Sequence, residues 1–334
     1  ADNMKFYRFD ESPLKLYGVP LYDREKLWQR LPDETLKDVS NLTGLARRCP
    51  GARVCLRTDS PEIAVKYTFE TFSVDIGMSI YACQSAHVLV GDRRKPYFAG
   101  LIGPKSYDKK TVDGSVKKKA EMEDVTIFLP RNERICDIEI GVADDARVEA
   151  PTPYDGKPIV YYGSSITEGG CCCNPFNVYN AAISNHLNMD YVNLGFSGSA
   201  KGELVIADFI NTLDMSAFVY DYDNNSPTAD TLRATHEPFF RRIREKHPDL
   251  PILMMSMPRE IYDPEFLERR DIIRETYDRA VAAGDKHVAF IDGFTFFGDT
   301  DRHTCMVDGT HPNDLGFYRM TQAVEPVLRK LLNL

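Results

Sequence analysis

The sequence has no apolar run close to the ~20 residues that a membrane-spanning helix requires. Its opening stretch, ADNMKFYRFDESP, contains no apolar signal segment. Positive charge is in deficit, because 41 Lys and Arg stand against 50 Asp and Glu and give a net charge of −9. This balance argues against a nucleic-acid partner, which would require a basic face. The one basic run, Lys117–Lys119, is followed by acidic residues and indicates a solvated loop or hairpin tip.

The eight cysteines show no pairing pattern. They form neither a CxxC pair nor the Cys/His alternation of a zinc site, so we expect no metal. Cys171, Cys172 and Cys173 are consecutive, and adjacent cysteines rarely reach disulfide geometry with each other. We therefore expect free, mostly buried thiols. Together with the missing signal segment they favour a cytoplasmic protein. A secreted or periplasmic protein is the alternative if a signal segment precedes this sequence.

The composition is globular, with 43% hydrophobic and 27% charged residues in 334, and this length favours two domains. Up to about residue 150 the apolar residues alternate with a period of two, which predicts a β-sandwich or jelly roll. One helical stretch is expected at 23–36. The segment EAPTPYDGKP (149–158) reads as a linker. We therefore expect an accessory domain in residues 1–150 and a second domain in residues 151–334. The predicted strands of the first are 53–59, 62–70, 78–92, 123–130 and 136–144.

Beyond the linker, near-continuous apolar runs alternate with helical stretches. This order predicts a doubly wound, parallel five-stranded α/β sheet of flavodoxin-like type, flanked by helices. In such sheets ligands bind outside the carboxyl ends of the strands. The predicted strands are 159–163, 190–196, 216–223, 251–258 and 287–292, and the predicted helices are 177–188, 200–211, 228–246, 264–283 and 313–332.

Polar and glycine-rich motifs stand where these strands end. They are GSSITEGG (163–170), GFSGSAKG (195–202), DYDNNSP (221–227) and, before the last helix, DGTHP (308–312). A serine is a weak nucleophile and needs a base within hydrogen-bond reach. His311 can supply this base for Ser165, and Asp308 can orient the imidazole. The backbone N–H groups of Ser165 and Gly198 and the side-chain amide of Asn225 are candidate donors to an oxyanion.

Each of these residues also has an ordinary structural interpretation. Ser165 fits a helix cap, Asp308 and His311 fit a turn before a helix, and Asn225 fits an Asx-turn. Because four such motifs fall at the edge of one sheet, we favour the functional interpretation. His303 is the alternative base, since it is the other histidine close to the site in sequence.

With these motifs the second half resembles the SGNH hydrolases, also called GDSL-type esterases, whose four motifs carry Ser, Gly, Asn and His. GSSITEGG resembles the opening motif, with Ser164 where Asp is usual and Ser165 as the nucleophile. GFSGSAKG points to Gly198. DYDNNSP matches the third motif loosely, without its Gly and Asp, and favours Asn225 over Asn224. DGTHP matches the Asp-x-x-His motif closely. The resemblance covers about half of the chain.

The resemblance implies a serine esterase with a Ser-His-Asp triad and no cofactor. A β-rich N-terminal half is typical of two-domain members, several of which deacetylate polysaccharides. We therefore expect short-chain acyl esters, with acetyl removal from a carbohydrate as the favoured reaction. The substrate would be a small-molecule or oligosaccharide ester, and nothing in the sequence specifies an oligomeric state. The alternatives are a lysophospholipase or thioesterase of the same fold, and a non-catalytic carbohydrate-binding protein.

Two further residues stand beside the predicted site. Glu168 lies where a helix dipole favours a carboxylate, and substrate contact is the other role that we consider for it and for Asn224. Cys171–Cys173 follow the same turn and are expected to line or support the pocket. Several aromatic residues of the N-terminal half fit either a core or a sugar-stacking role: Tyr67, Phe69, Phe72, Tyr81, Tyr97 and Phe98.

Overall fold

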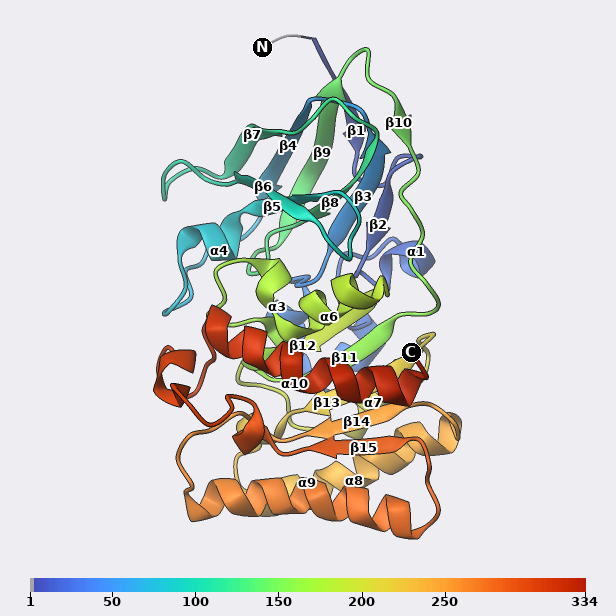
Figure 1. The fold of residues 1–334 in the computed structure, drawn as a ribbon, viewed down its shortest axis with the longest axis vertical. Coiled ribbons are helices and arrows are strands. Elements are labelled where there is room, and N and C mark those ends of the chain that lie inside the picture. The colour runs from blue at the N-terminus through green and yellow to red at the C-terminus, as the bar shows by residue number, and fades with distance from the viewer. Residues whose placement is uncertain (1–2) are drawn as a thin grey trace.

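The computed structural model describes residues 3–334, which form three β-sheets (Figure 1). The strands of the N-terminal half are β1 (Met4–Arg8), β2 (Lys15–Tyr17), β3 (Arg53–Thr58), β4 (Glu62–Phe69), β5 (Ala86–Val90), β6 (Tyr97–Ile102), β7 (Thr111–Lys117), β8 (Glu123–Phe128), β9 (Ile135–Ala143) and β10 (Val148–Glu149). One antiparallel sheet has the order β1-β9-β4-β7. The other has the order β10-β3-β8-β5-β6, with β2 paired to β3.

The two antiparallel sheets share one hydrophobic core. Ile63, Val65 and Tyr67 of β4 lie in it, as do Val54 and Leu56 of β3. They are spaced two apart because alternate side chains of a strand point to the same face. The β-sandwich predicted from the period of the sequence is therefore confirmed.

The third sheet is parallel and comes from the C-terminal half. Its strands are β11 (Ile159–Gly163), β12 (Tyr191–Gly195), β13 (Ala217–Asp221), β14 (Ile252–Met255) and β15 (Val288–Ile291). Their order, β12-β11-β13-β14-β15, confirms the predicted doubly wound, flavodoxin-like sheet. In this order the first strand lies inside the sheet, so that ligands are expected beyond its carboxyl end.

Helices cover both faces of the parallel sheet (Figure 1). Odd-numbered residues of β11 face the core beneath α6 and α10, and even-numbered residues face α7, α8 and α9. The helices are α5 (Ser165–Glu168), α6 (Tyr179–Leu187), α7 (Leu204–Ile210), α8 (Ala229–Lys246), α9 (Pro264–Ala282) and α10 (Asp314–Leu332). Short 3-10 turns are η2 (Pro175–Asn177), η3 (Asp223–Asn225), η4 (Gly293–Thr295) and η5 (Arg302–Cys305).

The structure corrects three expectations for the N-terminal half. The expected strand at 78–92 begins as a helix, α4 (Ile80–Gln84), because the Ser79 hydroxyl accepts from the N–H of Ala82 and caps it. The expected helix at 23–36 is split into α1 (Tyr22–Glu25) and α2 (Asp33–Leu36). Five strands were not expected, because apolar and polar residues alternate only weakly in their sequences: β1, β2, β6, β7 and β10.

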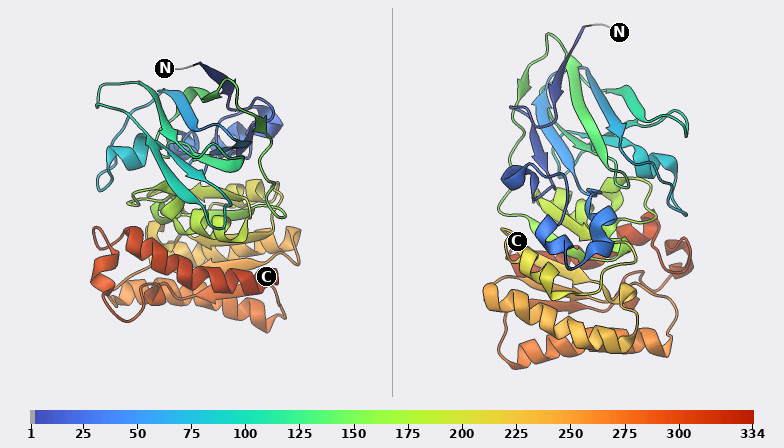
Figure 2. Two further views of the ribbon diagram at one scale, coloured as in Figure 1. Left: turned by 45° about the horizontal axis from the view of Figure 1, so that its top comes forward. Right: turned by 180° about the vertical axis from the view of Figure 1, so that it is seen from behind.

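The two halves are packed into each other. Hydrophobic residues of the N-terminal segment 21–46, among them Leu31 and Leu42, lie in the same core as Val160 of β11 and Phe239 of α8. This segment includes α1, α2, η1 (Ser40–Leu42) and α3 (Thr43–Ala46). In the right-hand view of Figure 2 its blue helices lie against the α/β half. The three sheets thus lie on one side or the other of the predicted boundary near residue 150, but residues of the N-terminal half form part of the core of the C-terminal half.

Candidate active site

Ser165 is placed by the sharp turn from β11 into α5. The hydroxyl of Ser164 accepts from the N–H of Ile166 at 3.2 Å and caps the helix. Ser165 is therefore the first residue of α5, and its hydroxyl is not needed for capping. Next to the turn, Gly195 allows a close approach of the backbone, because a Cβ there would lie 2.2 Å from the backbone nitrogen of Glu168. The capping role considered for Ser165 is filled by Ser164.

Ser165, His311 and Asp308 form one hydrogen-bonded chain. The Asp308 carboxylate accepts from Nδ1–H of His311 at 2.8 Å. With its proton on Nδ1, the imidazole accepts at Nε2, which lies 2.8 Å from the hydroxyl oxygen of Ser165. The serine is buried at 6% exposure, whereas a quarter of the His311 side chain is open to solvent. This geometry allows the imidazole to take the serine proton.

The carboxylate of Asp308 is held in its charged form. Its second oxygen accepts from the backbone N–H groups of Thr310 and His311 at 2.9 and 2.8 Å. Partial burial raises its pKa, but the hydrogen bonds from the backbone and imidazole of His311 and from Thr310 outweigh this and lower the pKa of Asp308 to about 2. Asp308 is therefore ionised at neutral pH and favours an imidazolium at His311.

Gly198 and Asn225 lie in adjacent loops at the same sheet edge. Gly198 has a φ of +65°, a left-handed conformation that suits glycine. Two residues on, the N–H of Ala200 donates to Oδ1 of Asn225 at 3.2 Å. Among the hydrogen bonds of residues 3–334, none uses the N–H of Gly198 or Nδ2 of Asn225 as donor. Both groups are thus free to donate to a ligand.

Glu168 and Asn224, considered as substrate contacts, are both engaged by protein groups. The Glu168 side chain is fully buried, and one oxygen accepts from the N–H of Ser197 at 2.9 Å. This burial argues against substrate contact, the second role considered for Glu168, and gives the side chain a role inside the protein. Oδ1 of Asn224 accepts from Nη2 of Arg259 at 2.6 Å, while Nη1 of Arg259 donates to the carbonyl of Gly309. Arg259 therefore ties the Asn224 loop to the turn that carries Asp308.

Three arginines beside the site were not found from the sequence. Besides Arg259, Arg30 and Arg131 reach it from the N-terminal half. Arg30 is fully buried and donates to the carbonyls of Asn193 and Gly195 at the end of β12. Arg131 pairs with Glu168, at 3.5 Å between Nη1 and Oε1. No periodicity or motif marks either residue, because each acts across the boundary between the two halves.

The other predicted features lie elsewhere or have structural partners. His303, the alternative base, is exposed in η5, and Ser165 bonds to His311 instead. All eight cysteines are free, and five are buried as expected: Cys49, Cys55, Cys83, Cys172 and Cys305. Within residues 3–334 no group of three or more His, Cys, Asp or Glu is arranged to hold a metal ion. No helix of this range has both the length and the apolar character to cross a membrane.

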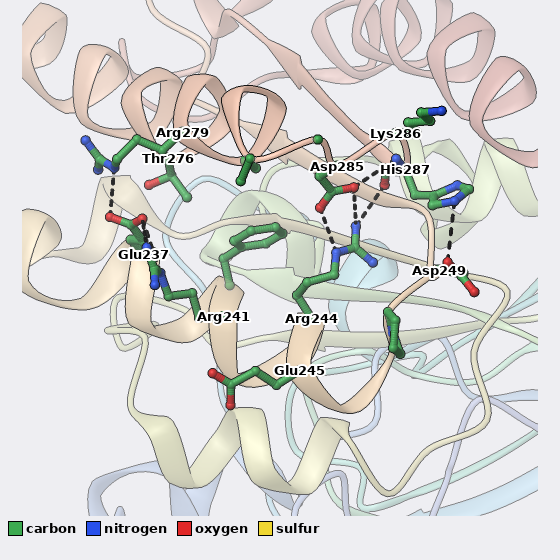
Figure 3. A pocket seen from close by; sticks show the side chains of 15 residues that line it. Glu237, Arg241, Arg244, Glu245, Asp249, Thr276, Arg279, Asp285, Lys286 and His287 are labelled. Carbon is green, nitrogen blue, oxygen red and sulfur yellow. Dashed lines mark hydrogen bonds and ion pairs between the residues drawn. The ribbon is translucent and has the colours of Figure 1, made fainter.

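A pocket of about 690 Å³ lies between α8 and α9 (Figure 3). It is lined where these helices end and β14 and β15 begin. Its charged side chains are largely paired: Arg244 with Asp285, Arg279 with Glu237, and His287 with Asp249. We assign it no part in the site.

Two family matches divide the chain as its sheets do. Residues 156–329 match the GDSL-like lipase/acylhydrolase family. Residues 4–148 match the family described as the N-terminus of SGNH-hydrolase-type esterases. No curated protein sequence matches the chain significantly.

Solved structures share the fold over nearly the whole chain. A protein of Bacteroides ovatus described as a GDSL-like lipase has 27% identity and a TM-score of 0.87, over 99% of this chain and 98% of that one. A salicylyl-acyltransferase of a tetracycline biosynthetic pathway has 21% identity and a TM-score of 0.80, over 98% and 97%. A family two carbohydrate esterase of Clostridium thermocellum, in complex with cellohexaose, has 16% identity and a TM-score of 0.60, over 85% and 93%.

The similarity of this chain to the acyltransferase and to the carbohydrate esterase shows only that they share a fold. The match of residues 156–329 spans half of the sequence and includes Ser165, Gly198, Asn225, Asp308 and His311. The resemblance seen in the four sequence motifs is confirmed by it: the chain belongs to the GDSL-like lipase/acylhydrolase family.

Proposed function

We propose that the protein is a serine esterase that removes short acyl groups, acetyl first among them, from a carbohydrate. Membership of the acylhydrolase family supports ester hydrolysis in general. The observation that carries the proposal is the chain of two 2.8 Å hydrogen bonds from Ser165 through His311 to Asp308. We assign catalysis to residues 151–334 and an accessory role to residues 1–150.

In the proposed mechanism the Ser165 oxygen attacks the ester carbonyl while Nε2 of His311 takes the serine proton. The carbonyl oxygen becomes an oxyanion, which accepts from the N–H groups of Ser165 and Gly198 and from Nδ2 of Asn225. When the intermediate collapses, the imidazolium gives its proton to the leaving alcohol, and an acyl-serine remains. A water molecule then attacks the acyl-serine while His311 takes a proton from the water. The acyl–serine bond breaks, the imidazolium returns that proton to the Ser165 oxygen, and the carboxylic acid is released.

The carbohydrate part of the proposal has two supports. The first is the fold likeness to the Clostridium thermocellum carbohydrate esterase with cellohexaose. The second is a cleft of about 360 Å³ between the β5–β6 hairpin and helices α6 and α10, which reaches Asp314, three residues after His311. Phe98 and Tyr318 line the cleft and are 46% and 59% exposed, so that part of each side chain is open to contact with a sugar. Of the other aromatic residues considered for stacking, Tyr67 and Phe69 are buried core residues.

The test is hydrolysis of p-nitrophenyl esters from acetate to decanoate, followed by a panel of acetylated sugars. Ser165→Ala and His311→Ala should reduce acetate turnover by at least ~10³-fold. The matched variants Ser164→Ala and His303→Ala should retain it within about tenfold, since neither side chain belongs to the proposed triad. Activity that peaks at long chains would replace the proposal with a lipase or thioesterase. Ester hydrolysis that persists in Ser165→Ala would overturn the assigned nucleophile.

A further inference from the structure

We infer that Arg131, in the loop between β8 and β9 of the N-terminal half, is a positioning residue for the oxyanion site of the C-terminal half. The inference rests on the proposed function, and it assigns the accessory half a direct part in the rate of the chemical step. Arg131 acts through Glu168, which holds the loop that carries Gly198.

The first link joins the two halves. Arg131 is 3% exposed and its Nη1 lies 3.5 Å from Oε1 of Glu168, whose side chain has no exposed surface. Its other terminal nitrogen, Nη2, donates to Asp75 at 3.0 Å. The stem packs against the turn after Ser165, because a Cβ at Gly169 would lie 3.6 Å from Cδ of Arg131. The guanidinium is therefore fixed between its own half and the catalytic turn.

The second link joins Glu168 to the Gly198 loop. The remaining oxygen of Glu168 accepts from the N–H of Ser197 at 2.9 Å, one residue before Gly198. On the far side of Gly198, the N–H of Ala200 donates to Asn225. The loop is thus held at one residue before and two residues after Gly198. These two anchors restrict the backbone dihedrals of the residues between them and so help to hold the direction of the Gly198 N–H.

A buried carboxylate needs a partner charge, since an isolated ion is costly to bury. Without Arg131 the buried Glu168 carboxylate would lose its ion-pair partner and would be held less firmly, which would weaken the hydrogen bond that it accepts from Ser197. Arg30, which like Arg131 belongs to the N-terminal half, donates to the carbonyls of Asn193 and Gly195, which come before the Gly198 loop in the chain. Its charge lies close enough to Glu168 for the two to attract each other, but among residues 3–334 it makes no hydrogen bond to Glu168.

The test compares Arg131→Met and Arg131→Lys with a control, Arg134→Met. Arg134 lies in the same loop, but its side chain pairs with Glu70, both are about 40% exposed, and Arg134 is not among the partners of the Glu168 side chain in residues 3–334. The concentration of reactive serine is titrated with a p-nitrophenyl phosphonate, so that kcat refers to folded sites alone. The substrate is p-nitrophenyl acetate, which is too small to report binding by the N-terminal half.

Arg131→Met should lower kcat by about 10- to 100-fold, below the ~10²–10³ of a lost oxyanion donor, with KM changed less than about threefold. Arg131→Lys, which keeps a cation, should recover part of this loss, and Arg134→Met should match the wild type. A kcat for Arg131→Met within about twofold of the wild type would overturn the inference. A merely structural role would lower the titrated serine and the Tm and leave kcat per site unchanged.

If Arg131→Met does not fold, the double variant Arg131→Met/Glu168→Gln removes both members of the pair, so that the Glu168 carboxylate is not left buried without Arg131. It should show the same fall in kcat, and normal kcat in this folded variant would also overturn the inference. Ser165→Ala separates the two claims. If Ser165→Ala abolishes turnover and the Arg131 variants are normal, this inference alone fails; if Ser165→Ala is fully active, the proposed function fails first.

Discussion

The backbone N–H of Ala200 donates to Oδ1 of Asn225 at 3.2 Å. This bond fixes the orientation of the amide, since the oxygen is turned toward the Gly198 loop and Nδ2 remains as a donor. Asn224, one residue earlier, directs its oxygen to Arg259 instead. Two adjacent asparagines therefore have different partners, which separates their proposed roles.

Asn225→Ala should lower kcat for p-nitrophenyl acetate by ~10²–10³, because an oxyanion donor is lost. Asn224→Ala is the matched control and should cost less than about tenfold, since it removes only an anchor of Arg259. Steady-state kinetics on both variants checks this. Equal losses in the two variants would contradict the assignment of the oxyanion donor to Asn225.

Asp308→Asn should reduce kcat by about 10⁴-fold, because an amide at this position no longer favours the imidazolium and the tautomer that bonds Ser165. His311 should remain in place, since the backbone N–H groups of residues 310 and 311 can still bond to an amide oxygen. The measurement is kcat at pH 7 to 8 with Tm as a control. A loss smaller than about tenfold in a folded variant would be evidence against the triad.

The low pKa of Asp308, about 2, predicts a pH dependence of stability. An aspartate in the unfolded chain titrates near 3.8, so the charged form is stabilised by folding. This contribution is fully present above about pH 4 and is lost as pH falls through 2. Half of the side chain is exposed, so solvent screening keeps the effect at about 1 kcal/mol or less.

Urea unfolding of the wild type and Asp308→Asn between pH 7 and 2 provides the measurement. The difference in unfolding free energy should shrink as the pH falls from about 4 toward 2. A difference that grows as the pH falls would show that the sign is wrong.

Gly195, the last residue of β12, and Gly198, in the loop that follows, should respond differently to alanine. At Gly195 a Cβ would lie 2.2 Å from the backbone nitrogen of Glu168, and neither backbone segment can move aside easily. At Gly198 no atom lies within 4 Å of a Cβ, and the cost is the left-handed φ of +65°. We expect Gly195→Ala to destabilise by about 3 kcal/mol or more, and Gly198→Ala by about 1–2 kcal/mol. Chemical denaturation measures both, and a larger effect at Gly198 would contradict the packing argument.

Much of the fold could be predicted because its signals are local. Period-two runs marked the sandwich, and apolar strands alternating with helices marked the parallel sheet. The stretch 78–92 shows the limit of such signals, because an apolar run fits a helix or a strand equally well. The cap at Ser79 turns its first part into α4, and pairing with β6 and β8 makes the second part a strand.

The sequence by itself determined which residues meet at the candidate site. Ser165, Gly198 and Asn225 follow three parallel strands, and the carboxyl ends of such strands share one edge. Only the tertiary structure decided what supports them. In the folded protein Glu168 points inward to Arg131, and hydrophobic residues of the segment 21–46 pack in the core of the other half. Those contacts join residues far apart in the chain, and a single side chain that acts across an interface leaves no periodic pattern in the sequence.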